Sequence, residues 1–262
     1  PTDPVFDTDG SYYTDPNVFE YLNPYAVAQT TVDERENNNL FVSLDTDLDI
    51  YDGLSLGWFG SWRKTNNTVG FFLPVESTDA NAINQDGFAN INNSNQDEKL
   101  TNVSLTYKNT FGAHQVDALA LYEWQQQTYQ GNYAQARGFF NNETSYHALQ
   151  GGDLSDVRTG DISSYKNDRS LVSFLGRLNY TLLDKYLLTV SYRRDGSSVF
   201  GENNKWGNFP AASVGWRIDE EDFMQEGIFD QLKLRGGFGI TGNQQGLFPQ
   251  QSLSLVSPGG IT

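Results

Sequence analysis

Paired segments of about ten residues, in which apolar and polar side chains alternate, most constrain how this chain of 262 residues can fold. The clearest pair flanks the polar loop 195–208, because alternation runs through 186–193 and resumes through 211–218. A period of two places successive side chains on opposite faces of a β-strand. The sequence therefore predicts antiparallel strands with one apolar face and one polar face.

The same pattern predicts strands along most of the chain, joined by tight turns at 51–53, 109–113 and 183–185. The predicted strands are 40–50, 54–63, 101–108, 114–123, 172–182, 186–193, 211–218 and 232–240, with a further strand-like segment at 251–256. The long ranges without periodicity are 1–37, 64–99 and 125–168, and we expect them to be irregular or to form loops.

Tight connections fall on one side of the predicted sheet and long connections fall on the other. This segregation is typical of an outer-membrane β-barrel, whereas a soluble β-sandwich has no reason to segregate its loops. We therefore expect an all-β fold, an antiparallel transmembrane β-barrel segment with its apolar faces toward lipid. Tyr180, Tyr186 and Trp216 stand where an interfacial aromatic belt is expected.

The composition limits the function. Mean hydropathy is −0.54, and no run of about 18 apolar residues exists, so membrane-spanning helices are excluded. A formal charge of −16 argues against a nucleic-acid partner, because no basic surface is apparent to bind phosphates. The absence of cysteine excludes disulfides and thiolate metal sites. We expect no cofactor.

Two short motifs fail when their structural context is considered. Asp45, Asp47 and Asp49 resemble the start of a calcium loop, but Ile50 and Leu56 stand where that loop needs Gly and Glu. Their spacing instead predicts acidic side chains on the water-facing side of a strand. We therefore expect no metal site there.

The pattern around Ser55 fits G-x-S-x-G, but this serine lies inside a predicted strand rather than at a strand-to-helix elbow. His114 and His147 are the only histidines, so acid–base constellations are sparse. We therefore expect that the protein is not an enzyme.

Aromatic residues crowd the range 125–168 and its border, among Gln, Asn and Gly. Rings beside amides can hold sugars or peptides or contact another protein, and the alternative is that they pack the loop against its neighbours. The candidate contact residues are Trp124, Tyr129, Tyr133, Phe139, Phe140 and Tyr146.

Several spaced blocks in and around the hairpin that flanks the loop 195–208 resemble, in order, the SusC/RagA family of TonB-dependent outer-membrane transporters. The blocks are 175–180, 184–189, 194–198, 200–201, 209–211, 232–235 and 241–244. Their motif residues, expected to have structural roles, are Asp184, Lys185, Tyr186, Arg194, Asp195, Gly196, Ser197, Ser198, Phe200, Gly201, Phe209, Pro210, Thr241, Gly242 and Asn243. Val199 stands where the family is expected to have a basic residue. We expect Asp195 and the serines to bond nearby backbone, and Gly196 to permit a turn.

The resemblance implies a bacterial outer-membrane β-barrel of 22 strands, with long extracellular loops and short periplasmic turns, closed by an N-terminal plug. It also implies active import of large nutrients, either glycans or peptides. The implied partners are a SusD-like surface lipoprotein, TonB acting through the N-terminal part, and membrane lipid. About eight or nine strands are readable, so we expect a middle portion of the barrel: residues 1–37 an irregular segment and 38–262 a partial barrel without the plug.

Four arginines recur on the polar faces of the predicted strands: Arg177, Arg193, Arg217 and Arg235. The resemblance implies that these side chains face the lumen and are able to pair with acidic groups of a plug. The alternative is a general role as polar lumen wall, because barrel alternation by itself places polar residues there.

Two other classes of function stay open. One is a self-contained eight-stranded barrel that acts as an adhesin or structural anchor and closes its first strand onto its last. The other is a soluble β-sandwich that binds carbohydrate. Finding the chain in the aqueous fraction without detergent favours the sandwich over either barrel.

Overall fold

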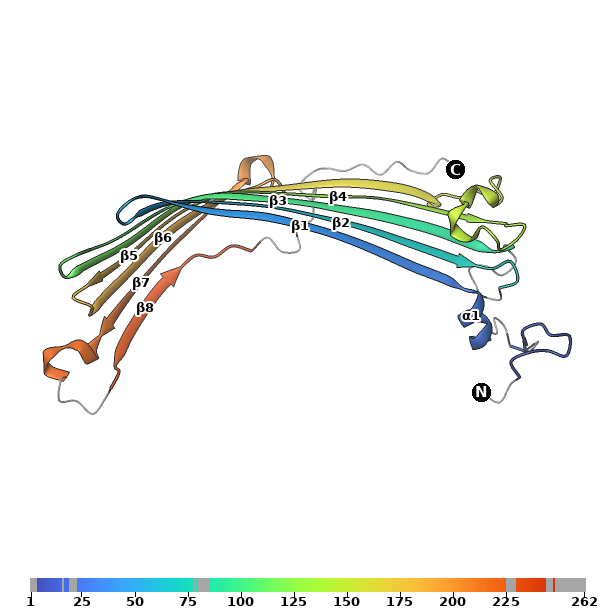
Figure 1. The fold of residues 1–262 in the computed structure, drawn as a ribbon, viewed down its shortest axis with the longest axis horizontal. Helices are drawn as coiled ribbons and strands as arrows, with labels where there is room; N and C mark the ends of the chain where they lie inside the picture. Colours follow the sequence, from blue (N-terminus) through green and yellow to red (C-terminus); the bar gives the residue numbers. More distant parts are fainter. Residues whose placement is uncertain are drawn as a thin grey trace.

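The computed structural model describes residues 4–15, 17–18, 23–77, 79, 85–224, 230–243 and 247. Within them, eight antiparallel strands form one sheet in sequence order (Figure 1). The strands are β1 (Val32–Tyr51), β2 (Leu54–Leu73), β3 (Phe88–Phe111), β4 (His114–Arg137), β5 (Ile162–Leu182), β6 (Tyr186–Ser197), β7 (Trp206–Arg217) and β8 (Lys233–Gly239). The all-β prediction and the order of the hairpins are confirmed. The strand-like segment 251–256 and the last residue of the block 241–244 lie outside the described residues.

Among the described residues, helical structure is confined to short pieces between the strands and ahead of them. The helix α1 (Pro24–Thr30) precedes β1, and 3₁₀ turns occupy η1 (Ser145–His147), η2 (Leu149–Gly151), η3 (Glu202–Asn204), η4 (Ile218–Glu220) and η5 (Asp222–Met224). In the part of the chain that the structure describes, no helix is long and apolar enough to cross a membrane.

The tight turns contain residues in the left-handed backbone conformation, which Gly and Asp adopt more readily than Leu. Gly53 has φ +80° in the β1–β2 turn, and Leu183 and Asp184 both have φ +55° in the β5–β6 turn. Two-residue hairpin turns favour such φ values, because their twist matches that of the strands. The β7–β8 connection lies at this same end but is longer, since it contains η4 and η5.

The ranges expected to be irregular are wrong in extent, because β1 to β5 are 20 to 24 residues long. β1 begins at Val32, after helix α1, so the strands start before residue 38. The range 64–99 is mostly β2 and β3, and the range 125–168 includes the ends of β4 and β5. Both faces of these extensions are mostly polar, and the apolar residues at their far ends, such as Phe71, Phe72 and Phe88, do not alternate. No period of two therefore marks the extensions, although their backbone ladders continue without interruption.

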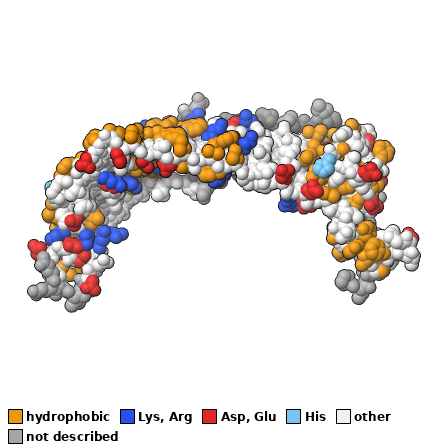
Figure 2. Space-filling view, in the orientation of Figure 1, with side chains coloured by type: hydrophobic (Ala, Val, Ile, Leu, Met, Phe, Trp, Pro, Cys, Tyr) orange, Lys and Arg blue, Asp and Glu red, His pale blue; other side chains and the backbone are white. Residues whose placement is uncertain are grey.

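The sheet has two chemically distinct faces, because register pairs apolar residues with apolar residues across neighbouring strands. The outer face is the one that carries Leu56, Val103, Ala120 and Leu178. The inner face carries the residues that alternate with outer-face residues along each strand. Figure 2 shows hydrophobic side chains along the convex side at the tight-turn end of the arch, with Lys and Arg side chains on its concave side.

The apolar band of the outer face matches a membrane-spanning strand in length. On β2 it runs from Leu54 to Trp62, which agrees with the roughly 9–11 residues that a tilted transmembrane strand needs. Tyr180, Tyr186 and Trp216 lie near the tight turns, which is the edge of the band at which an aromatic belt was predicted. Beyond Trp62 and the facing residues, β1 to β5 continue as a polar extension (Figure 1).

A small core closes the far end of this extension. Phe72, Ala89, Phe139 and Tyr146 are buried together, because the β4–β5 connection folds onto the outer face of β2 and β3. The ring of Tyr146 occupies the space that a Cβ at Gly70 would need. The loop is therefore fixed to the strands by apolar contact.

The described sheet is open and has one layer. Each strand pairs only with its sequence neighbours, so β1 and β8 lie at opposite edges. This is not the arrangement that a closed eight-stranded barrel or a two-layered sandwich requires.

Candidate functional site

The expectation that the six aromatic candidates crowd one long loop and its border is wrong, because three of them lie on strand β4. Trp124 lies on the outer face, where it pairs with Val172. Phe139 and Tyr146 are buried in the loop core, while Phe140 is 98% exposed. Tyr129 and Tyr133 belong to strand β4 and not to a loop.

The inner face of the polar extension brings three tyrosines together. Tyr129 and Tyr133 flank Gly131 on β4, and Gly131 pairs with Tyr165 on β5. A Cβ at Gly131 would lie 2.9 Å from the Tyr165 ring, so the absence of a side chain lets that ring lie over the backbone. We call Tyr129, Tyr133 and Tyr165 the tyrosine cluster; it spans about 13 Å of strand.

Amide side chains surround the ring of Tyr129, one member of the tyrosine cluster. Gln96 Nε2 donates to Glu98 Oε1 (2.7 Å) and to the hydroxyl of Tyr129 (3.3 Å). Gln127 Nε2 donates to the same Glu98 oxygen (3.3 Å), and Arg63 lies 3.6 Å from the other. Burial, and then the charge of Glu98, raise the pKa of Tyr129, so its phenol stays neutral and can donate.

A buried ion pair supports the ring of Tyr133, another member of the tyrosine cluster. The hydroxyl of Tyr133 donates to Gln135, whose Nε2 donates to Asp161. Arg137 binds both carboxylate oxygens of Asp161 (2.8 and 3.0 Å), and the side chain of Asp161 is only 3% exposed. This hydrogen bonding from Arg137 holds the pKa of Asp161 well below its usual range.

The chemistry of the tyrosine cluster is therefore that of neutral rings and amides. Two nearby charge pairs compensate each other, Arg63 with Glu98 and Arg137 with Asp161. Arg169, on the inner face of β5, is a further charge that acts on Tyr129 and opposes the rise in its pKa. Aromatic faces pack against the C–H groups of sugars or against apolar parts of peptides, while amides and phenols supply hydrogen bonds. Sequence reasoning missed Tyr165, because the strand that carries it has no apolar alternation at that point.

The four predicted arginines all lie on the inner face. Arg193 binds Asp195 (2.8 Å) and the hydroxyl of Ser173 (3.1 Å), and it lies 3.9 Å from Glu123. Arg217 pairs with Glu220 and Asp219 in η4. Both therefore have partners within the chain, while Arg177 and Arg235 are exposed on this face.

The motif blocks, far apart in sequence, meet around a cavity of about 180 Å³ on the inner face. Asp195, Ser197, Phe200, Phe209, Gly242 and Asn243 line it together with neighbouring residues. A Cβ at Gly242 would overlap the Phe209 ring, so this glycine permits close packing of two blocks. At the tight-turn end, Lys185 and Tyr186 both donate to Glu221.

The expected role of Gly196 in a turn is wrong. Gly196 lies within β6, paired with Val172, and the ring of Trp206 covers it where a Cβ would stand. Ser198 does bond backbone, because its hydroxyl accepts from the Ser170 N–H (2.8 Å). Asp195 instead binds the side chain of Arg193, and Val199 is buried.

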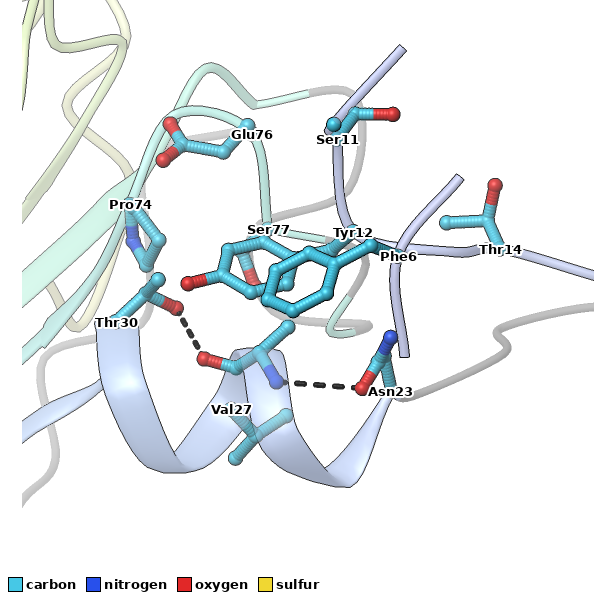
Figure 3. Close-up of a pocket in the computed structure, with 12 residues that line it drawn as sticks. Phe6, Ser11, Tyr12, Thr14, Asn23, Val27, Thr30, Pro74, Glu76 and Ser77 are labelled. Atoms are coloured by element: carbon cyan, nitrogen blue, oxygen red, sulfur yellow. Dashed lines mark hydrogen bonds between the residues drawn. The ribbon is translucent and has the colours of Figure 1, made fainter. Parts of the chain in front are cut away.

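A second pocket, of about 460 Å³, lies between the segment 6–14, helix α1 and the β2–β3 connection (Figure 3). Phe6 and Tyr12 stack at 5.5 Å along its wall. Asn23 donates to the carbonyls of Val5 and Tyr13 and accepts from two N–H groups of α1. The polar groups of Asn23 thus hold the chain together, and the pocket is a less direct candidate than the tyrosine cluster.

Among the described residues, no group of three or more acidic or histidine side chains is arranged to hold a metal ion.

Comparison with known proteins gives consistent matches. The sequence model for the family described as TonB dependent receptor-like, beta-barrel matches residues 1–256. TonB-dependent receptor P3 of Formosa agariphila is 34% identical over 97% of the chain and 25% of its own length. TonB-dependent receptor SusC of Bacteroides thetaiotaomicron is 35% identical over 55% of the chain and 14% of its own length. The chain thus spans about a quarter, or less, of these relatives.

The fold is also found among solved structures. The RagAB peptide transporter superposes with a TM-score of 0.84 at 20% identity, covering 98% of the chain and 28% of that protein. A RagAB peptide importer in its open-open state gives a TM-score of 0.73 at 22% identity, over 91% of the chain and 26% of that protein.

Proposed function

The chain belongs to the TonB-dependent receptor β-barrel family of outer-membrane proteins, and on that premise we propose that it forms part of the wall of a nutrient importer. The cargo is a large polar molecule that passes along the inner face. The observation that carries this proposal is the tyrosine cluster, because neutral rings and amides gather on the inner face of an extension that reaches beyond the apolar band.

We propose a glycan as the first class of cargo. Both charge pairs beside the tyrosine cluster are compensated within the wall, and Arg169 is a further charge near Tyr129, so neutral rings and amides make up most of the groups offered to a ligand there. A peptide is the second class, and it is favoured by the likeness to a structure described as a peptide transporter. A SusD-like surface lipoprotein and TonB are proposed as partners, because one relative is named SusC and the family is TonB-dependent.

Uptake by cells that make the full-length protein tests the proposal. The probes are a fluorescent neutral heptasaccharide and a fluorescent heptapeptide, compared in wild-type cells and in a deletion strain. Tyr165→Ala, in which a half-exposed ring is removed, should reduce uptake of the glycan roughly tenfold, since one stacked ring contributes about 1–2 kcal/mol. Tyr51→Ala is the matched control, because that ring is 60% exposed at the opposite end of the strands.

Each outcome is informative. Uptake that depends on the gene and on Tyr165 supports the proposal, and the better probe assigns the class of cargo. Uptake of both probes that is unchanged by deletion of the gene would refute the import function. Equal losses in the Tyr165 and Tyr51 variants would refute the role of the tyrosine cluster.

A further inference from the structure

The outer face carries few cations, and those on its described strands gather where the apolar band ends. The four basic residues are Lys64, Lys99, Lys166 and Arg194, on β2, β3, β5 and β6. Lys99 lies at the edge of the apolar band and the other three lie beyond it. We call Lys64, Lys99, Lys166 and Arg194 the cationic girdle.

The position of the cationic girdle is set by the end of the apolar band. On β2, Lys64 is the next outward residue after Trp62, and on β6 Arg194 is the next after Tyr192. On β3, Lys99 pairs with Trp62 itself. Figure 2 shows basic side chains where the hydrophobic band gives way to the polar part of the arch. Because the chain has a net charge of −16, the gathering of these cations at the end of the apolar band calls for a local explanation.

The side chains of the girdle lie at the surface in defined surroundings. Lys64 lines a polar groove of about 270 Å³, in which Asn66, Asn95, Thr128 and Gln130 are among its neighbours and Asp97 is the one carboxylate. The guanidinium of Arg194 lies 4.9 Å from the centre of the Trp206 ring, which keeps it at the edge of the band.

The acidic groups on this part of the outer face already have partners. Asp97 accepts from the indole N–H of Trp62 (3.1 Å) and lies 3.6 Å from Lys99. Asp168 accepts from the hydroxyl of Thr128 (2.6 Å). The Lys99–Asp97 contact is the one ion pair that the described residues give to the girdle, so its other cations are available to an external anion.

We propose that the cationic girdle binds the phosphate groups of lipids in the outer leaflet. The apolar band below it contacts acyl chains, and the first polar groups of a lipid above those chains are its phosphates, at the level of Lys64 and Arg194. Amides in the groove beside Lys64 supply hydrogen bonds to phosphate or sugar oxygens of a headgroup. This assignment is independent of cargo, because the girdle and the tyrosine cluster lie on opposite faces.

Native mass spectrometry of the full-length protein with lipid A tests the proposal. The triple variant Lys64→Gln, Lys99→Gln, Arg194→Gln should bind bisphosphorylated lipid A about fivefold more weakly for each cation removed. Wild-type protein should also prefer the bisphosphorylated form over monophosphoryl lipid A.

A matched control removes the same charge away from the girdle. It is the triple variant Lys108→Gln, Arg158→Gln, Lys233→Gln: Lys108 and Lys233 lie on the inner face, and Arg158 lies in the β4–β5 connection. This variant should bind bisphosphorylated lipid A as wild-type protein does. Thermal unfolding in detergent should be similar for both variants, because the replaced side chains lie at the surface.

Three results would overturn the proposal. The first is unchanged lipid A binding by the girdle variant, and the second is an equal loss in the control variant. The third is displacement of lipid A by inorganic phosphate at constant ionic strength, which would make the girdle a site for the free anion.

Discussion

Asp161 is the residue whose replacement most directly tests how the extracellular β4–β5 loop is held. Its carboxylate accepts two hydrogen bonds from Arg137, one from Gln135 and one from the N–H of Arg158 (2.7 Å). Arg137 ends β4 and Asp161 immediately precedes β5, so the pair closes the base of the loop. Asp161→Asn keeps the shape of the side chain and removes its charge.

The cost of this change follows from burial. The side chain of Asp161 is 3% exposed and that of Arg137 is 10% exposed, so the variant leaves a guanidinium nearly enclosed without its counter-ion. Removing one partner of a buried ion pair costs about 3–5 kcal/mol. The surroundings are only one sheet and one loop thick, so water lies close by and the lower value, about 3 kcal/mol, applies. The rest of the sheet retains its ladder, so the loss is local.

Hydrogen exchange of the full-length protein measures this local opening. Amides in 138–161 should exchange roughly 150-fold faster in Asp161→Asn, because about 1.4 kcal/mol corresponds to a factor of ten. Asp156→Asn is the control, since its partner Arg158 is 52% exposed and such a pair contributes little. An acceleration of less than about fivefold in Asp161→Asn, or equal effects in both variants, would show that the ion pair does not hold the loop.

The pKa of Asp161 gives this contact a definite pH dependence. Because the folded-state pKa is lowered, the stabilisation is fully present above the ordinary carboxyl pKa of about 3.9. It is lost as pH falls below that value toward the folded-state pKa. Loop exchange, corrected for intrinsic rates, should therefore be constant from about pH 8 to about pH 5 and accelerate only in strong acid.

Three further changes test other parts of the structure. Phe72→Ala should destabilise the loop core by about 3–5 kcal/mol and speed exchange around it, whereas Phe140→Ala, which removes an exposed ring, should change nothing measurable. Gly131→Ala should displace the Tyr165 ring and, because its Cβ would also lie 2.6 Å from the backbone oxygen of Asn93, strain the β3–β4 ladder; glycan uptake should fall, and unchanged uptake would contradict the geometry. Hydrogen bonds led by that from Tyr186 lower the pKa of Glu221, so exchange in the η4–η5 turn should rise as pH falls below about 4.5 in wild type but not in Glu221→Gln.

The apolar half of the sheet could be predicted from sequence because burial in lipid leaves a pattern of period two. Leu54 to Trp62 and Tyr186 to Tyr192 show that pattern, and the structure places both in strands. The tight β1–β2 turn was also predictable, since Gly53 readily adopts the left-handed backbone found there.

The polar half could not be predicted, for a physical reason. Asn66 pairs with Asn95 and Asn95 with Gln130, so three strands align polar residues that carry no alternation. Water contacts both faces of this extension, and the ladder of backbone hydrogen bonds forms regardless of side-chain type. The tyrosine cluster was found only in part for the same reason: Tyr165 becomes its member through strand pairing, which no local pattern around it indicates.

Register explains how this half keeps its two faces distinct. A shift of one residue in β4 would exchange Tyr129 on the inner face with Gln130 on the outer face. Polar side chains in water do not prevent such a shift, but the ladder is continuous with the apolar half, where the same shift would turn Tyr122 inward and Glu123 toward lipid. The fit of the Tyr165 ring over Gly131 adds a local constraint. The lipid-facing half therefore determines which residues of the polar half lie on the inner face.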